Sequence, residues 1–197
     1  MTTIENLLSN TNFKHSRHVS KISKLIAAKA GYSEDEVQII EQAGLLHDVG
    51  KTAISSNILN KPDALTPEEY ELIKKHTDIG YQKIMETIKI LTVAASVAKE
   101  HHERLDGSGY HKLSGENINP YAKLIMVADV FDALVSRRSY KKAWDTENAI
   151  KYLTEHENHF DPDIVRCLIS IIDELMLLYK TNLTQNIASN NAYFQIN

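Results

Sequence analysis

Helical periodicity runs through most of this chain and limits the possible folds more than any other feature of the sequence. Apolar residues recur every three or four positions, which places them on one face of an α-helix. Neither the alternation expected of a half-buried strand nor an internal repeat is visible. The sequence therefore predicts an all-α fold in the form of a helical bundle.

Signals for helix ends divide the periodic pattern into segments. We expect a first helix from about residue 12 to 30, ended by Gly31. A second should open at Ser33 and Glu36, which have the spacing of a capping box. Residues 50–65 are predicted to form a loop. Further helices are expected to begin at Thr66-Pro67, with an interruption near Gly80, at about residue 89, at Asn119-Pro120, at Asp145 and at Asp161-Pro162.

Length and composition indicate one domain of ordinary globular character. The chain has 197 residues, of which 43% are hydrophobic, and this is enough to form a buried core. We interpret residues 1–180 as a single domain. Residues 181–197 are rich in Asn and Gln and are interpreted as a polar C-terminal tail, to which no role is assigned.

Charge and cysteine content narrow the choice of compartment and partner. The net charge of -4 does not indicate a nucleic-acid polymer or an anionic membrane as partner, although a small anionic substrate is compatible with it. The single cysteine, Cys167, cannot form an intrachain disulfide. The N-terminus lacks the pattern of a signal peptide, and no apolar run approaches ~20 residues. We therefore expect a cytoplasmic protein that does not bind membranes.

The stretch from Gly44 to Lys51 places an imidazole, His47, beside a carboxylate, Asp48. This mix of nitrogen and oxygen ligands suits borderline and hard divalent metals. His47 continues an apolar helical stripe, so it is expected at the buried end of that face. The same position is also compatible with a histidine that only packs in the core.

Other residues offer the ligands that would complete such a site. The neighbours His101 and His102 should point about 100° apart, which suits the edge of a two-metal cluster, and Asp48 could bridge two ions with its two oxygens. Asp129 interrupts an apolar helix, where a buried carboxylate needs a cation or a donor. His111, His156 and His159 are interpreted as surface or loop residues. The candidate ligands are His15, His47, Asp48, His76, His101, His102 and Asp129.

The order of these residues resembles the HD-GYP domain, a branch of the HD metal-dependent phosphohydrolases. The resemblance covers residues 15 to about 165, and its most specific part is the stretch from His101 to Tyr110. The matching segments are His15-Ser16 with Val19, Leu45–Lys51, Ile58–Pro62, Leu65–Glu69, His76 with Ile79-Gly80, His101–Tyr110, and Asp129–Leu134 leading to Arg138 and Tyr140.

The resemblance implies a helical bundle of the HD-domain phosphohydrolase type with two divalent metal ions, iron or manganese. All the candidate ligands would hold them, with Asp48 as the bridge. In members with a third ion a Glu lies one helical turn before the first histidine, and Thr11 stands there in this chain. Two ions a few Å apart would activate a bridging water to hydroxide and neutralise charge on the phosphoryl oxygens in an in-line displacement.

The same resemblance implies a phosphodiesterase that hydrolyses cyclic di-GMP to linear pGpG, or a mixed cyclic GMP-AMP dinucleotide. Lys51 is the expected catalytic partner of Asp48, with its ammonium on a phosphate oxygen. Arg138 and Lys141 are expected to hold substrate phosphate, and Asp132 to reach guanine. For the three basic residues a solvated helix end or loop is the alternative interpretation.

The chain departs from the family pattern in several places. The Gly-Tyr-Pro after which the family is named reads Gly109-Tyr110-His111, and the loss of proline restores a backbone donor. The usual Arg of the first motif is His18, and an Arg-Pro-Tyr segment reads Arg138-Ser139-Tyr140. In the family the Gly-Tyr-Pro loop is linked to substrate specificity and to docking of diguanylate cyclase domains. No expected metal ligand is lost.

Other functions remain open on the sequence alone. A related HD enzyme would hydrolyse another nucleotide phosphoester, whereas a non-catalytic module would bind cyclic di-GMP or a protein without turnover. A helical scaffold would leave the histidines singly exposed. Most members of the family carry a receiver or sensor domain before the HD-GYP part, whereas the first helix expected here begins near residue 12. Regulation is therefore expected from a separate protein partner, such as a diguanylate cyclase domain or a receiver protein, from the tail, or from the level of expression.

Overall fold

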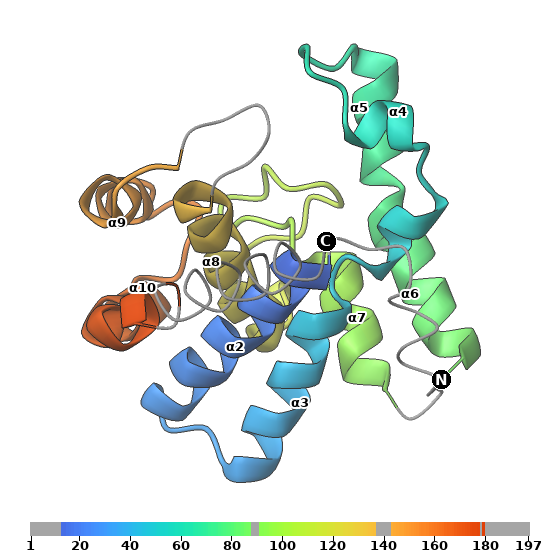
Figure 1. Ribbon diagram of the computed structural model, residues 1–197. Coiled ribbons are helices and arrows are strands. Elements are labelled where there is room, and N and C mark those ends of the chain that lie inside the picture. Colours follow the sequence, from blue (N-terminus) through green and yellow to red (C-terminus); the bar gives the residue numbers. More distant parts are fainter. Residues whose placement is uncertain (1–12, 88–90, 137–142, 178, 180–197) are drawn as a thin grey trace, which may run out of the picture.

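The computed structural model describes residues 13–87, 91–136, 143–177 and 179, which form helices and loops without a strand among them (Figure 1). The prediction of an all-α fold is therefore confirmed. In chain order the helices are α2 (Phe13–Lys29), α3 (Glu34–Leu46), η1 (Val49–Ala53), α4 (Ser56–Leu59), α5 (Pro67–Lys74), α6 (His76–Thr87), α7 (Thr92–Glu100), η2 (Gly115–Asn117), α8 (Pro120–Val135), α9 (Thr146–Glu155) and α10 (Pro162–Ser170).

The helix ends follow the capping chemistry that the sequence predicts. At the start of α3, Ser33 and Glu36 form a complete capping box, and Thr66 and Glu69 form another at the start of α5. Gly31 follows α2 with a φ of 85°, a left-handed conformation that glycine adopts without steric cost. The helices predicted at Asn119-Pro120, Asp145 and Asp161-Pro162 also begin where expected.

Two local predictions are wrong. The segment 50–65, predicted as a loop, contains most of η1 and all of α4. The interruption expected near Gly80 lies instead at Lys75, between α5 and α6, and Gly80 is an internal residue of α6. An ideal Cβ at Gly80 would meet its nearest neighbours at 3.4 Å, an ordinary contact distance, so the packing of α6 on η1 does not require glycine here. The tail 181–197 lies outside the described residues.

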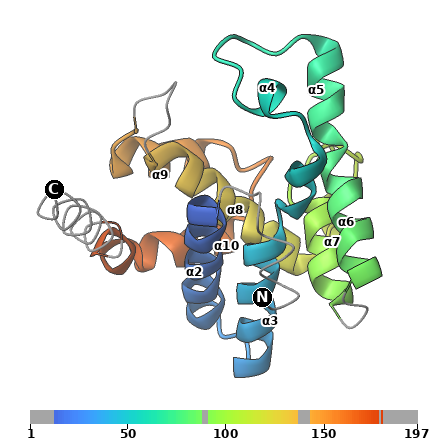
Figure 2. The same cartoon turned by 45° about the vertical axis from the view of Figure 1, so that its right-hand side comes forward.

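Helix α8 forms the centre of the bundle (Figures 1 and 2). Helices α2, α3, α7, α9 and α10 all contact it, while α2 packs on α3, α3 on α7, and α7 on α6. Side chains of α8 are buried on almost every side, including those of Asp129 and Asp132. The central helix thus carries two carboxylates into the interior, where each requires a partner. None of the described helices combines the length and the apolar composition needed to cross a lipid bilayer.

Gly50 holds η1 against the start of α6, and its replacement provides the first test. An ideal Cβ at Gly50 would lie 2.6 Å from the Gly80 nitrogen and would overlap the carbonyl oxygen of His76. Gly50→Ala should therefore lower the free energy of unfolding by about 1–3 kcal/mol, the usual cost of overpacking, as measured by urea denaturation.

Gly80→Ala is the matched control for this prediction. A Cβ at Gly80 meets its nearest neighbours, Ala98 Cβ and the Gly50 nitrogen, at 3.4 Å, an ordinary contact distance. Alanine is also the better residue inside a helix, so stability should stay the same or rise slightly. Equal destabilisation by both changes would contradict the close approach of η1 and α6.

Candidate metal centre

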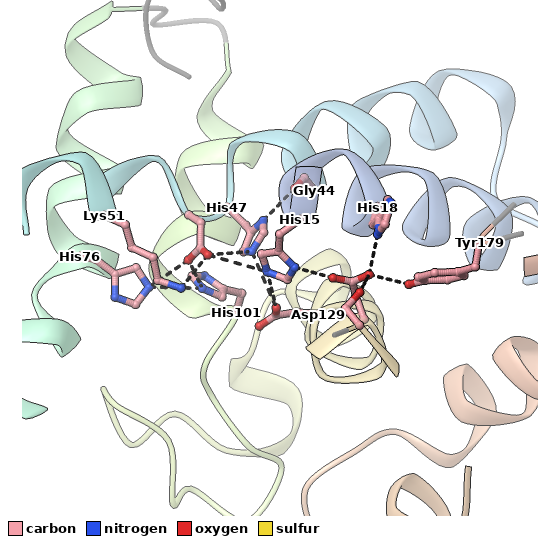
Figure 3. A network of polar contacts seen from close by, with 12 residues as sticks. His15, His18, Gly44, His47, Lys51, His76, His101, Asp129 and Tyr179 are labelled. Carbon is pink, nitrogen blue, oxygen red and sulfur yellow. Dashed lines mark hydrogen bonds and ion pairs between the residues drawn. The ribbon is translucent and has the colours of Figure 1, made fainter. Parts of the chain in front are cut away.

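The candidate site lies where the ends of several helices meet on the central helix. His47 follows the last residue of α3, Asp48 precedes η1, His76 begins α6, and His101 follows α7. Each of these residues is at most 4% exposed. Figure 3 shows the side chains of His15, His47, His76, His101 and Asp129 turned toward one another from these separate segments. Residues that are far apart in the chain therefore form one buried polar cluster.

The cluster consists of two groups of possible metal ligands. The ligand atoms of Asp48, His76, His101 and His102 lie within 4.8 Å of one another, and so do those of His15, His47 and Asp129. All the ligands expected from the sequence are thereby gathered in the structure.

Asp48 lies between the two groups and faces both. Its Oδ1 is 3.4 Å from His76 Nε2 and 3.6 Å from His101 Nε2. Its Oδ2 is 3.4 Å from His47 Nε2 and 3.9 Å from His15 Nε2. One carboxylate oxygen thus faces each group, which is the arrangement that a bridging ligand requires.

Three of the histidines are oriented by the same local contact. The Nδ1 atoms of His47, His76 and His101 each bond a carbonyl oxygen three residues earlier, at 2.8, 2.6 and 3.0 Å. Because a carbonyl only accepts, each Nδ1 must carry its hydrogen. In the neutral ring this leaves a lone pair on Nε2, the atom that faces the cluster. Such an outer contact fixes both the tautomer and the direction of a metal-binding imidazole.

The charges inside the cluster favour a bound cation. Burial lowers the pKa of His76 to about 3, and burial also lowers the pKa of His101, so both rings are neutral at pH 7. For Asp48, burial is the largest single influence and would raise the pKa, but Lys51, His47 and His101 together outweigh it and hold the pKa well below its usual value. Burial likewise lowers the pKa of His15, but the carboxylates of Asp129, Asp132 and Asp48 more than reverse this and raise it to about 10. Ionised carboxylates and neutral imidazoles are the states that bind metals, so Asp48, His76 and His101 are ready to do so, whereas His15 would have to release a proton when a metal binds.

Two buried atoms of the cluster lack a hydrogen-bond partner in the described part of the chain. They are His47 Nε2 and Asp48 Oδ1. A buried polar atom without a partner is costly, and native proteins rarely keep one without a reason. Both atoms lie among the candidate ligands, so a divalent metal would satisfy them. The residues present therefore fit a metal centre of nitrogen and oxygen ligands, of the kind that borderline metals prefer.

Lys51 reaches the same carboxylate from the solvent side. Its Nζ lies 2.6 Å from Asp48 Oδ2, and its side chain is 32% exposed. An ammonium in this place is available both to the cluster and to a ligand that approaches from outside. This fits the sequence expectation of a basic group beside the metal ligands.

Asp132 lies one helical turn beyond Asp129 and is only 1% exposed. Its Oδ2 accepts a hydrogen bond from His15 Nδ1 at 2.6 Å, and its Oδ1 accepts from His18 Nδ1 at 2.9 Å. The hydroxyl groups of Ser136 and Tyr179 also donate to Oδ1, at 2.9 and 2.5 Å. These surroundings differ from the contact with guanine expected from the resemblance, because both oxygens already accept hydrogen bonds from side chains of the protein. In this structure Asp132 orients His15.

Replacement of Asp132 tests this orienting role. Asp132→Ala should weaken Mn²⁺ binding about 10- to 100-fold, the usual cost of losing an outer partner of a metal-binding histidine. Asp132→Asn keeps an oxygen that can accept from His15 Nδ1 and should weaken binding less. Titration calorimetry of the two variants provides the comparison, and unchanged affinity in Asp132→Ala would contradict the assignment.

Sequence reasoning missed several contacts at the edge of the site. Nothing in the sequence indicated that Tyr179 lies near the candidate site, and His18 was marked only as a departure from the family motif. Both side chains bond Asp132. The bond of Tyr179 to Asp132 joins residues 47 positions apart, and a periodic pattern carries no signal for such a contact. Arg138 and Lys141, expected to hold phosphate, lie outside the described residues, as does Thr11.

Comparison with known proteins identifies similar domains. A family described as HD domain matches residues 2–164. The cyclic di-GMP phosphodiesterase response regulator RpfG of Xanthomonas campestris is 45% identical over 154 residues, which are 77% of this chain and 41% of that protein. The 3'3'-cGAMP-specific phosphodiesterase 2 of Vibrio cholerae is 36% identical over 167 residues, 83% of this chain and 32% of that protein.

A solved structure shows the same arrangement of helices. The protein Bd1817 of Bdellovibrio bacteriovorus, described as an HDG"Y"P protein, matches with a TM-score of 0.69 and 25% identity. The match covers 82% of this chain and 52% of that one. The chain therefore spans about half the length of this structure, and less than half of the two curated relatives.

Proposed function

Because the chain belongs to the HD domain family, we propose that it is a metal-dependent phosphodiesterase that hydrolyses cyclic di-GMP to linear pGpG. The observation that carries the proposal is the position of Asp48, with one oxygen toward each of the two ligand groups. A pair of metal sites joined by one carboxylate suits displacement at a phosphodiester, where charge must be neutralised on several oxygens together. The name of the relative RpfG supports cyclic di-GMP as the substrate.

In the proposed reaction some side chains would bind the metal ions, and backbone contacts would orient the histidines among them. When bound, two divalent ions, iron or manganese, would supply Lewis-acid chemistry that lowers the pKa of water and neutralises phosphate charge. His15, His47 and Asp129 would hold one ion, and His76, His101 and His102 the other, with Asp48 shared. The carbonyl contacts of the histidine Nδ1 atoms keep the Nε2 lone pairs directed inward before any ion arrives.

Lys51 is proposed to act on the substrate itself. Its Nζ lies beside Asp48, yet the side chain remains partly exposed, so it can meet a phosphate that enters from solvent. The ammonium would donate a hydrogen bond to a non-bridging phosphate oxygen and offset the charge that gathers there in the transition state. Arg138 and Lys141 are proposed to hold the other phosphate.

Cyclic GMP-AMP is the second candidate substrate. It is favoured by the relative from Vibrio cholerae, whose name specifies 3'3'-cGAMP. The chain departs from the family motif at His111, within the loop linked to substrate choice. We further propose a cytoplasmic setting and a regulatory protein partner, such as a diguanylate cyclase domain or a receiver protein, which the response-regulator name of RpfG supports.

A competition assay separates the two substrates. Protein purified without oxygen and loaded with Fe(II) or Mn(II) is given both dinucleotides together, and the linear products are resolved by chromatography. The proposal predicts linear pGpG as the main product. Preferential loss of cyclic GMP-AMP would favour the second candidate. No product from either, with metal bound, would refute both and leave another phosphoester or a binding role.

A further inference from the structure

The glycine-rich loop after α7, residues 104–113, is held in place by the buried carboxylate of Glu103, the residue that directly precedes it. Glu103 is fully buried, and its two oxygens accept the backbone N–H groups of His111 and Leu113 at 2.8 and 2.7 Å. Gly109 lies so close to this segment that an ideal Cβ would come 2.8 Å from the carbonyl oxygen of His102. The loop is thus folded tightly over the residues that follow the second histidine of the doublet.

The imidazole of His111 makes a second attachment, to helix α6. Its Nε2 lies 3.1 Å from Thr77 Oγ1 and 4.0 Å from Asp78 Oδ1. The Thr77 hydroxyl has a single hydrogen, which it donates to the carbonyl of Lys74 at 2.9 Å. Toward His111 it can therefore only accept, so His111 Nε2 is the donor. A proline at position 111 would lack both the backbone and the side-chain donor.

Tyr110 directly precedes His111 and packs against two of the candidate metal ligands. Its ring is tilted against that of His102, with centroids 4.7 Å apart, and lies 6.3 Å from His76. Tyr70 also packs edge to face against it at 5.9 Å, and Lys74 Nζ lies 5.6 Å from the Tyr110 ring centroid. Aromatic rings beside an ammonium suit a ligand that has both a base and a phosphate.

We infer that His111 is a positioning residue, which latches the glycine loop to Thr77 and thereby sets where Tyr110 lies beside His102 and His76. The inference deepens the proposed function and rests on it, since Tyr110 would form one wall of the nucleotide site. Leu105 and Asp106, near the start of the loop, bond the carbonyls of His159 and Asn158, whereas the His111 contact with Thr77 ties the far end of the loop to α6. The latch depends on a histidine that stands where the family motif has proline.

Kinetic constants of a small set of variants test the latch in the metal-loaded chain. His111→Ala should raise the KM for the cyclic dinucleotide about fivefold, the size of one neutral hydrogen bond, with kcat within about twofold. His111→Gln retains a donor at the same reach and should restore KM. Thr77→Val should match His111→Ala, and the double variant should be no worse than either single one. Thr77→Ser, which keeps the hydroxyl, is the control.

Hydrogen exchange of loop residues 104–113 provides a readout that needs no turnover. Exchange should be about fivefold faster in His111→Ala and Thr77→Val, but not in His111→Gln or Thr77→Ser. Unchanged exchange in His111→Ala, or additive effects in the double variant, would overturn the latch. Should the wild-type chain hydrolyse no dinucleotide, the proposed function fails, while the exchange measurement still decides whether His111 fastens the loop.

Discussion

Replacing Asp48 by alanine is expected to lower turnover of the cyclic dinucleotide by at least about 10³-fold. The change removes the residue that faces both ligand groups, with one oxygen 3.4 Å from His76 Nε2 and the other 3.4 Å from His47 Nε2. Both metal sites lose a ligand together, so metal content should fall as well. Turnover and bound metal, measured on the same preparation, provide the test.

Asp63→Ala is the control for this prediction, since it removes an exposed carboxylate from a loop. It should leave turnover and metal content unchanged. The contrary result for Asp48→Ala would be full metal content with turnover near that of the wild type. In that case Asp48 would be only a partner of Lys51, and the two ligand groups would be independent.

Replacing Lys51 by alanine should lower turnover without lowering metal content, unlike the replacement of Asp48. We expect kcat to fall about 10²- to 10³-fold, the usual effect of removing one donor that stabilises developing charge. Metal content should stay at the wild-type level, because Lys51 offers no lone pair to a metal in its charged form. Steady-state kinetics combined with metal analysis separates this outcome from the Asp48 result.

Lys61→Ala is the matched control for the Lys51 variant. Lys61 also pairs with a carboxylate at 2.6 Å, that of Glu69, but its partner is the capping residue of α5 rather than a candidate ligand. Its loss should leave kcat unchanged. Loss of bound metal in Lys51→Ala would show that the lysine maintains the centre, and its proposed contact with phosphate would then be wrong.

The helices were predictable because their signals are local. Capping boxes at Ser33 and Thr66 need only a residue and its third neighbour, and the structure contains both. The buried position of His47 follows from the helical stripe that precedes it, and this residue is fully buried. The interruption predicted at Gly80 was wrong, because an isolated glycine lowers helix propensity without ending a helix, and α6 continues through it.

The composition of the candidate site was predictable, but its geometry was not. The ligands could be proposed from residue type, spacing and resemblance, and the structure gathers all of them. The shared contact of three Nδ1 atoms with carbonyls depends on how each helix ends. The position of Asp132 between His15, His18 and Tyr179 depends on packing of three distant segments. Neither arrangement has a signature in one sequence.

The most direct test of the central claim is the metal content of the wild-type chain together with its electron paramagnetic resonance spectrum. The chain is loaded with Mn(II), freed of excess metal and analysed for manganese per chain. The account predicts two ions per chain and a spectrum of two magnetically coupled ions, because one Asp48 carboxylate faces both groups. A single ion, or two ions without coupling, would contradict a centre bridged by Asp48.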